Sequence, residues 1–361
     1  MAAAPKKIIF LGCPLDCDEK YDSIMEKLAG SPEAGTSTDP LVPVLHHIGT
    51  SVAEDRWDVA GSVPVPDWLL PLPPVQEHGR INAEEMVSFI DGDNCRKFAA
   101  TAGQWTEEKI LPQIPCLVAV DHSISGGVFS ALSRHYGRDN LSLIIVDSHT
   151  DAVPMDVLAG AVQYDMDTNP NSVHDANDPL LYNRPDSYNA STFVHHLLEK
   201  EVVDARNLYL IGVSDYPDKK ARRIKDPRIG AYVEVFSRLK EGGVSIVTKK
   251  ECKLKPQKVD VALKRIDTPY VYVSIDMDIG ARNALNGVRF RNWQGLMEKQ
   301  INRIGEQIAA ITTRGIELAG IDVTEFNMRY AGRPGRDGRD GRDGIDPTFQ
   351  IAADLLKTIA F

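Results

Sequence analysis

The chain has 361 residues, of which 43% are hydrophobic and 25% are charged, so it carries enough apolar material for a large core. Its 51 acidic residues outnumber its 41 Lys and Arg residues, which gives a net charge of −10. So acidic a balance argues against binding to nucleic acid, because that binding depends largely on basic side chains.

Nothing in the sequence predicts a membrane protein or a secreted one. No apolar run approaches the roughly 18 residues that suggest a membrane span, and the start, MAAAPKKIIFLG, lacks the layout of a signal peptide. The five cysteines are odd in number and scattered, which fits a reducing compartment better than a disulfide framework. We therefore expect a cytoplasmic protein with structural cysteines.

Apolar runs rich in β-branched residues recur along the chain and predict strands covered on both faces. In chain order these runs are 7–11, 116–120, 143–146, 208–213, 244–247, 270–275 and 316–323. Helical spacing of apolar residues predicts helices at 126–135, 192–200, 228–239, 258–265, 293–313 and 348–359. This alternation predicts βαβ units and a three-layer α/β/α fold with a mostly parallel sheet. We expect a single domain over residues 1–361.

Several regions have the composition of loops. Residues 31–43 and 62–76 are rich in Pro, Gly and Ser or Thr, and residues 152–188 are polar with many Asn, Asp and Pro residues. We interpret 152–188 as a long insertion, because loops of that length are usually functional or disordered. Residues 331–345 repeat Gly, Arg and Asp with glycines three apart, too briefly for a collagen helix. We interpret them as a surface loop, with a flap over an active site as the alternative.

Carboxylate and imidazole side chains follow three of the predicted strands. Alternate residues of an extended segment share a face, and open parallel sheets bind ligands beyond the carboxyl ends of their strands. The residues at these ends are Asp121 and His122; Asp147, His149 and Asp151; and Asp276 and Asp278. Clustered carboxylates repel one another unless a cation lies between them. A mixture of carboxylate and imidazole suits manganese or a related first-row ion, so the sequence predicts a metal cluster.

The segments VDHSISGG, VDSHTD, SIDMDIG and GIDVTEFN resemble, in order and spacing, the four signature segments of the arginase/agmatinase ureohydrolases. The resemblance covers residues 116–361, and KKIIFLGCPLD is similar to the first strand of that family. It implies an arginase-like fold that holds two Mn²⁺ ions, with Asp147 and Asp276 bridging them. The six implied ligands are His122, Asp147, His149, Asp151, Asp276 and Asp278.

The resemblance also implies hydrolysis of a guanidino compound to urea and an amine. Glu325 matches the family carboxylate that pairs with the substrate guanidinium, a contact that suits bidentate, charge-assisted hydrogen bonding. Two metals make hydroxide available near neutral pH, and Asp151 is placed to carry a proton toward the leaving amine. Family members often form trimers or hexamers, so we expect a homo-oligomer that acts on a small guanidino or amidine substrate.

One departure from the family concerns the proton shuttle. In the segment YNASTFVHHLLEK, Ala190 or Ser191 stands where family members carry a catalytic His. His195 and His196 lie about a turn further on, where packing of a helix is the expected role. His174, in the polar stretch 152–188, is the candidate substitute.

A second departure leaves the substrate open. The loop after Asp278 contains Arg282, Arg289 and Arg291, which are candidates for binding a substrate carboxylate or are solvated loop residues. A substrate-binding role is assigned to Arg282. Two alternative functions follow: hydrolysis of a formimino or amide group on the same scaffold, or metal binding without catalysis.

Overall fold

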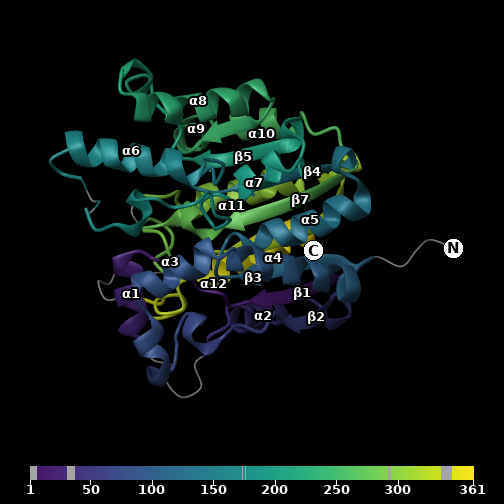
Figure 1. Cartoon of the computed structure of the whole chain (residues 1–361). Coiled ribbons are helices and arrows are strands. Elements are labelled where there is room, and N and C mark those ends of the chain that lie inside the picture. The colour runs from purple at the N-terminus through teal and green to yellow at the C-terminus, as the bar shows by residue number, and fades with distance from the viewer. Residues whose placement is uncertain (1–5, 31–36, 173, 175, 292–293, 335–343) are drawn as a thin grey trace.

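The computed structural model describes residues 6–30, 37–172, 174, 176–291, 294–334 and 344–361. They form one sheet with helices on both of its faces (Figure 1). The sheet has eight strands in the order β2-β1-β3-β8-β7-β4-β5-β6, and every pairing is parallel. The predicted α/β class is therefore confirmed. The strands are β1 (Ile8–Cys13), β2 (Trp57–Ser62), β3 (Ile114–Ala119), β4 (Leu141–Val146), β5 (Leu208–Val213), β6 (Ser245–Thr248), β7 (Tyr270–Asp276) and β8 (Glu317–Thr324).

The helices form the two outer layers. Those that pack on one face of the sheet are α3 (Ala83–Asp91), α4 (Asn94–Trp105), α5 (Ile124–Tyr136), α7 (Phe193–Glu199) and α8 (Pro227–Glu241). The opposite face is covered by α2 (Leu41–Gly49), α9 (Lys249–Leu254), α10 (Gln257–Leu263), α11 (Glu298–Ala309) and α12 (Thr348–Ala360). Figure 1 shows α4 and α5 lying in front of the sheet.

Each face of the sheet has its own apolar core, which explains why the strands read as continuous apolar runs. In β4, Leu141, Leu143 and Ile145 join the core beneath α5, whereas Ile144 and Val146 join the core beneath α12. All six residues of this strand are buried. Polar side chains on such strands are placed at low cost only at the ends, where the chain leaves both cores.

All seven predicted strands are present, and the structure adds one that was not predicted. β2 pairs with β1 at the edge of the sheet, where its residues are only partly covered. Its sequence, WDVAGS, contains Asp58 and a glycine at φ 107°, Gly61. A half-covered edge strand needs no long apolar run, which is why composition did not reveal it.

The stretch 152–188 is not a loop throughout, which corrects the interpretation drawn from its polar composition. It contains the 14-residue helix α6 (Met155–Thr168), which packs against α8 (Figure 1). Val157 and Leu158 contact the core next to α5, but Met155 is the only residue of α6 that is fully buried. A helix with so narrow an apolar face resembles a polar loop in composition.

Two other expectations concern segments near residues that the structure leaves undescribed. The predicted helix 293–313 is found as the shorter α11, Glu298–Ala309, and Trp293 lies outside the described residues. The Gly/Arg/Asp repeat falls largely on residues 335–343, which are also outside them, so its loop and flap interpretations stay predictions. Its base is closed by an antiparallel bridge between Pro334 and Ile345. The remaining helix, α1, spans Tyr21–Leu28.

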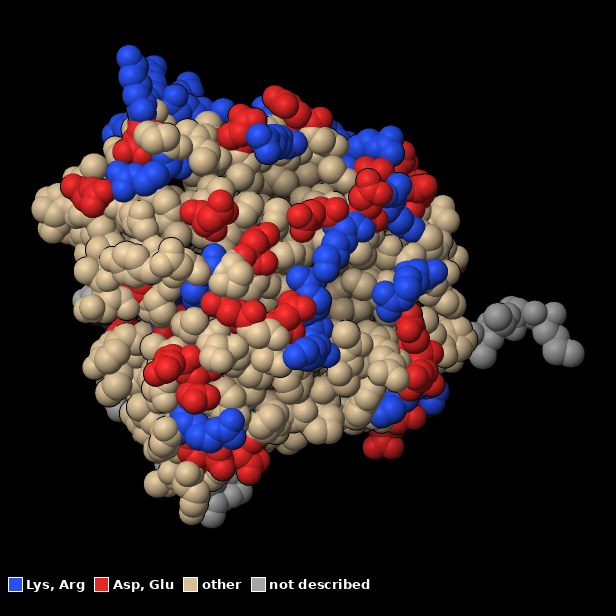
Figure 2. Space-filling model, viewed as in Figure 1, with Lys and Arg blue, Asp and Glu red and all other residues tan. Residues whose placement is uncertain are grey.

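Charged side chains of both signs mix on the surface (Figure 2), while the cysteines lie inside. On the face shown in Figure 2, Lys and Arg side chains are interspersed with Asp and Glu. All five cysteines are buried and free. In the described part of the chain, no helix is both long and apolar enough to cross a membrane.

Close packing of α4 against α5 gives the first prediction. A Cβ atom on Gly127 would overlap the backbone carbonyl of Ala99, which cannot move as a flexible side chain can. We expect Gly127→Ala to lower the free energy of unfolding by about 3 kcal/mol, measured by urea denaturation. Gly230→Ala in α8 is the control, because a Cβ there meets nothing within 4 Å and alanine favours helix by up to about 1 kcal/mol. Equal stabilities of the two variants would contradict the packing argument.

Candidate metal centre

The six predicted ligands meet beyond the carboxyl ends of neighbouring strands. His122 follows β3, Asp147 begins the segment after β4, and Asp276 ends β7. In the sheet, β7 lies between β4 and β8, and β3 lies on the other side of β8. Strand order therefore gathers residues that are more than 150 positions apart in the chain, since His122 and Asp278 belong to one cluster.

One half of the cluster surrounds His122. Its Nδ1 atom lies 3.0 Å from Oδ2 of Asp151 and 3.3 Å from Oδ2 of both Asp147 and Asp276. None of these contacts has hydrogen-bond geometry, so Nδ1 of His122 and Oδ2 of Asp147 are buried without a hydrogen-bond partner among the described residues. Nitrogen and oxygen atoms that converge without hydrogen-bond partners surround a position that a cation would fill.

The other half surrounds His149. Its Nδ1 atom lies 3.0 Å from Oδ2 of Asp278 and 3.4 Å from Oδ1 of Asp147. Asp147 thus faces both histidines, one through each carboxylate oxygen. The side chain of His149 is 33% exposed, whereas those of His122, Asp147 and Asp278 are each 1% exposed, so solvent reaches the cluster beside His149.

The electrostatics of the cluster show a shortage of positive charge. Burial raises the pKa of Asp151 to about 8, and burial also raises the pKa of Asp276 well above its usual range. Burial also acts to raise the pKa of Asp147, but the contacts of this carboxylate with His122 and His149 outweigh burial and lower the pKa. For both histidines burial favours the neutral ring, yet the surrounding carboxylates raise the pKa well above its ordinary value. The carboxylates can all ionise together only if cations join them.

Three buried residues that were not predicted form a hydrogen-bond chain that orients His122. The hydroxyl of Ser274 donates to Oδ1 of Asp322 (2.8 Å), and Tyr272 donates to Oδ2 of the same carboxylate (2.6 Å). Because the Ser274 hydrogen is used in this way, its oxygen accepts from Nε2 of His122 (2.9 Å). When the ring is neutral, as a metal ligand must be, its lone pair is then on Nδ1, which faces the three carboxylates. Outer hydrogen bonds of this kind are typical of metal-ligating histidines, so the donor set fits a metal.

The turn after β4 is held by contacts that the sequence did not reveal. Asp215, which follows β5, accepts from the backbone N–H of Thr150 (3.2 Å) and from its hydroxyl (2.8 Å). Asp151 adopts φ 50°, a left-handed conformation that is uncommon outside glycine. Its carbonyl accepts the N–H groups of Val194 (3.0 Å) and His195 (3.1 Å). The first turn of α7 therefore supports the strained residue.

Glu325 lies next to the cluster in a similarly strained conformation, at φ 65°. Its N–H donates to the carbonyl of Val120, and its Oε1 accepts the N–H of His122, each at 3.0 Å. Its Oε2 is buried without a hydrogen-bond donor among the described residues and lies 3.8 Å from Nε of Arg289. Burial raises the pKa of Glu325 to about 8, although the Arg289 guanidinium acts in the opposite direction.

Arg289 is neither a solvated loop residue nor free to meet a substrate carboxylate. Its side chain is 7% exposed, with Nη1 2.6 Å from Oδ1 of Asp16 and Nη2 3.4 Å from Oδ2 of Asp18. Together with Glu325, these carboxylates raise its pKa well above the ordinary range although burial opposes its charge. The expectation that this arginine either binds substrate or lies in solvent is therefore replaced by an internal ion-pair network.

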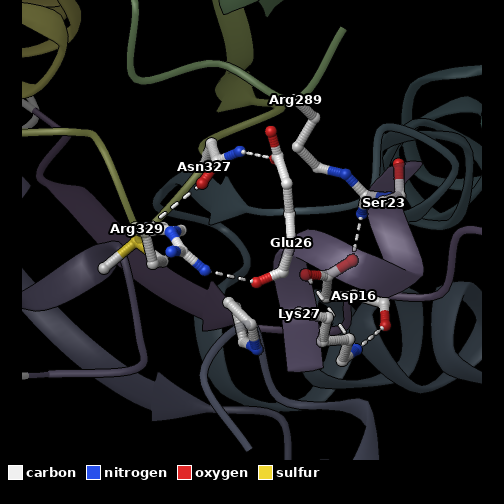
Figure 3. Close-up of a pocket in the computed structure, with 9 residues that line it drawn as sticks. Asp16, Ser23, Glu26, Lys27, Arg289, Asn327 and Arg329 are labelled. Carbon is white, nitrogen blue, oxygen red and sulfur yellow. Dashed lines mark hydrogen bonds and ion pairs between the residues drawn. The ribbon is translucent and has the colours of Figure 1, made fainter. Parts of the chain in front are cut away.

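Figure 3 shows how the segment after β8 is attached to α1 beside a cavity of about 30 Å³. The side chain of Glu26 accepts from Nδ2 of Asn327 (2.9 Å), and its backbone carbonyl accepts from Nη1 of Arg329 (2.9 Å). Arg291 also contacts the Glu26 carboxylate. These bonds hold the chain immediately after Glu325 in place.

Two of the predicted site residues interact outside the cluster. Arg282 is exposed, and its backbone N–H donates to the carbonyl of Leu285 (2.9 Å). His174 is partly exposed, with Nδ1 3.9 Å from Oδ2 of Asp178. Within the described residues, neither side chain forms a hydrogen bond or ion pair with any of the six clustered residues, and their roles in catalysis or substrate binding stay predictions.

The comparison of Arg289 with Arg282 gives the second prediction. Arg289→Met should lower the free energy of unfolding by about 3–5 kcal/mol, because it leaves buried carboxylates without their cation. Arg282→Met replaces an exposed side chain on the same loop and should change that free energy by less than about 0.5 kcal/mol. Guanidinium chloride is unsuitable here because it supplies the lost cation, so unfolding by urea is the measurement. A similar loss in both variants would contradict the buried network.

Comparison with known proteins agrees with this geometry. The model of the Arginase family matches residues 87–359, well over half of the chain. The chain belongs to the arginase family. The predicted resemblance to a divergent ureohydrolase is thereby confirmed, and no curated protein matches the sequence.

Solved structures of other arginase-family proteins share the fold at low sequence identity. Proclavaminate amidino hydrolase from Streptomyces clavuligerus aligns with a TM-score of 0.57 and 15% identity, covering 99% of this chain and 92% of that one. Arginase from Bacillus caldovelox aligns with a TM-score of 0.56 and 16% identity, covering 98% of both chains. Formimidoylglutamase from Bacillus subtilis aligns with a TM-score of 0.56 and 15% identity, covering 99% of this chain and 87% of that one. These identities show the common fold, while the names of the neighbours span different substrates.

Proposed function

We propose that the chain is a metal-dependent hydrolase that cleaves a linear C–N bond of a guanidino compound to give urea and an amine. The observation that carries the proposal is the convergence of six carboxylate and imidazole side chains. Several of their nitrogen and oxygen atoms are buried without a hydrogen-bond partner among the described residues. Family membership supports the same conclusion.

The donor set divides into two sites that share carboxylates. His122 and Asp151 would hold one divalent ion, and His149 and Asp278 the other. Asp147 and Asp276 would lie between the two ions. Manganese is the expected metal, since carboxylate with imidazole suits first-row ions of intermediate hardness. When bound, the ions lower the pKa of a water molecule and stabilise the negative charge that develops during attack.

The chain's own groups then bind the substrate and move the proton. Oε2 of Glu325, buried without a donor, would accept an N–H of the guanidinium, while Oε1 stays bonded to His122. Asp151 would take the proton of the attacking water and pass it to the leaving nitrogen. The water oxygen thus joins the central carbon, the C–N bond breaks, and the amine leaves with the transferred proton.

Arg289 favours a second candidate, hydrolysis of a neutral amide. Its guanidinium stands 3.8 Å from Oε2 of Glu325, the same atom that would receive a cationic substrate. An uncharged amide meets no repulsion from this arginine, whereas a guanidinium does. The two candidates differ in their products, because a guanidino compound releases urea and a primary amide releases ammonia.

The proposal is tested by incubating the Mn²⁺-loaded protein with arginine, agmatine, guanidinobutyrate, guanidinopropionate and a set of small amides and formimino compounds. We expect urea from one of the guanidino compounds. Asp276→Asn should abolish turnover and reduce the metal content below two ions per chain, while the protein stays folded by circular dichroism. Asp139→Asn, an exposed residue before β4 at the opposite edge of the sheet, is the matched control and should change neither quantity. Full metal content in Asp276→Asn would contradict the ligand assignment.

The role of His174 is tested separately. If it carries the proton onward from Asp151, His174→Ala should lower kcat by about 100-fold and leave metal content intact. An unchanged kcat and pH profile would remove His174 from the mechanism and leave Asp151 as the residue that moves the proton.

A further inference from the structure

A second group of metal-ligating side chains lies beside α7, outside the six residues already described. We call it the α7 cluster; it consists of Asp186, His195, His196 and Glu199. Each residue offers one ligand atom, and these four atoms lie within 4.8 Å of one another. Nε2 of His195 is 3.0 Å from Oδ2 of Asp186, and Nδ1 of His196 is 3.7 Å from Oε2 of Glu199.

His196 is the feature that packing alone does not explain. It is 5% exposed, and neither of its ring nitrogens has a hydrogen-bond partner among the described residues. The backbone carbonyl of Ser187 lies nearby without reaching hydrogen-bond geometry, and Nε2 is 4.0 Å from Oδ1 of Asp186. A buried imidazole without a partner is costly, and a metal ion is a partner that would satisfy it. Arg96, the cation that faces this ring, is itself paired with Asp93 at 2.8 Å.

The distances suit an ion of the zinc class. Zinc bonds of about 2.0–2.2 Å in tetrahedral geometry place neighbouring ligand atoms roughly 3.3–3.6 Å apart. His196 would give one ring nitrogen to the ion, and Nδ1 lies 3.7 Å from the Glu199 carboxylate while Nε2 lies 4.0 Å from that of Asp186. The four ligand atoms lie within 4.8 Å of one another, so rotations of the side chains are enough to bring them together. Glu199 has the most freedom to adjust, because its side chain is 59% exposed.

The position of the α7 cluster connects it to the metal centre. Oδ1 of Asp186 accepts the N–H of Met155 at the start of α6 (3.3 Å). The N–H groups of Val194 and His195 donate to the carbonyl of Asp151, which is held at positive φ. An ion bound by the cluster would therefore fix the loop before α7, the start of α6 and the turn that carries Asp151 to one another.

We propose that the α7 cluster binds one divalent ion of the zinc class, held by two imidazole nitrogens and two carboxylate oxygens. This site is additional to the proposed pair of ions and does not depend on their presence. The two sets of ligands have no residue in common, and they meet only through the backbone of Asp151.

The test is the zinc content of the full-length chain, measured by mass spectrometry after equilibrium dialysis against micromolar Zn²⁺. The wild-type protein should bind one ion more than the double variant His195→Gln/His196→Gln, whatever number the main centre holds. With both centres filled, the expected contents are three and two ions per chain. His174→Gln, another partly exposed histidine of the stretch before α7, is the control and should match the wild type. Equal zinc contents in the wild type and the double variant would overturn the proposal.

Because the double variant removes the buried His196 and can misfold, a milder variant tests the same site. Glu199→Gln alters an exposed ligand and should leave the fold intact. It should weaken binding of the additional ion at least about tenfold, which is the effect of losing even an outer-shell partner. Competition with a chromophoric zinc indicator measures this affinity, and an unchanged value would also count against the site.

Discussion

Negative charge buried at one edge of the sheet is the constraint on which the rest of the structure depends. Asp147, Asp276 and Asp278 are each at most 3% exposed. An ionised carboxylate in such a place costs several kcal/mol unless a cation accompanies it. Arg289 supplies one cation, but it is already surrounded by carboxylates of the segment after β1 and by Glu325. Within the part of the chain that the structure describes, the ion-pair partners of the remaining carboxylates are His122 and His149, so this edge of the fold is built for cations taken from solution.

The parallel sheet explains why the charge is gathered there. Both faces of each central strand are covered by apolar cores, and the carboxyl ends are where polar side chains leave them. Ser274 and Asp322 are among the exceptions, since both are polar, lie inside strands and are 0% exposed. Their hydrogen bonds end on His122 and direct its free nitrogen toward the carboxylates. These two polar residues inside the sheet therefore orient a side chain that lies beyond its edge.

The features that could be predicted from the sequence are those that depend on a local pattern of residues. Continuous apolar runs gave seven strands, and alternate ionisable residues after them identified the side chains that converge. Partners that meet only through the fold could not be found in this way. Arg289 and Asp16 are 273 positions apart, yet they form one ion pair. The helix α6 was missed because its narrow apolar face is hidden in a polar composition, and β2 because an edge strand needs little apolar sequence.

The internal guanidinium beside Glu325 changes how substrate recognition must work. In a site where a carboxylate stands alone, a cationic substrate gains both a hydrogen bond and an attraction between charges. Here Oε1 is used by the N–H of His122, and the charge on Oε2 is shared with Arg289. Repulsion from Arg289 weakens the attraction between Glu325 and the guanidinium of a substrate, although the hydrogen bond between them remains available. Selection among substrates must then rest on hydrogen-bond geometry and shape more than on net charge, which is why the choice between a guanidino compound and a neutral amide turns on this one arginine.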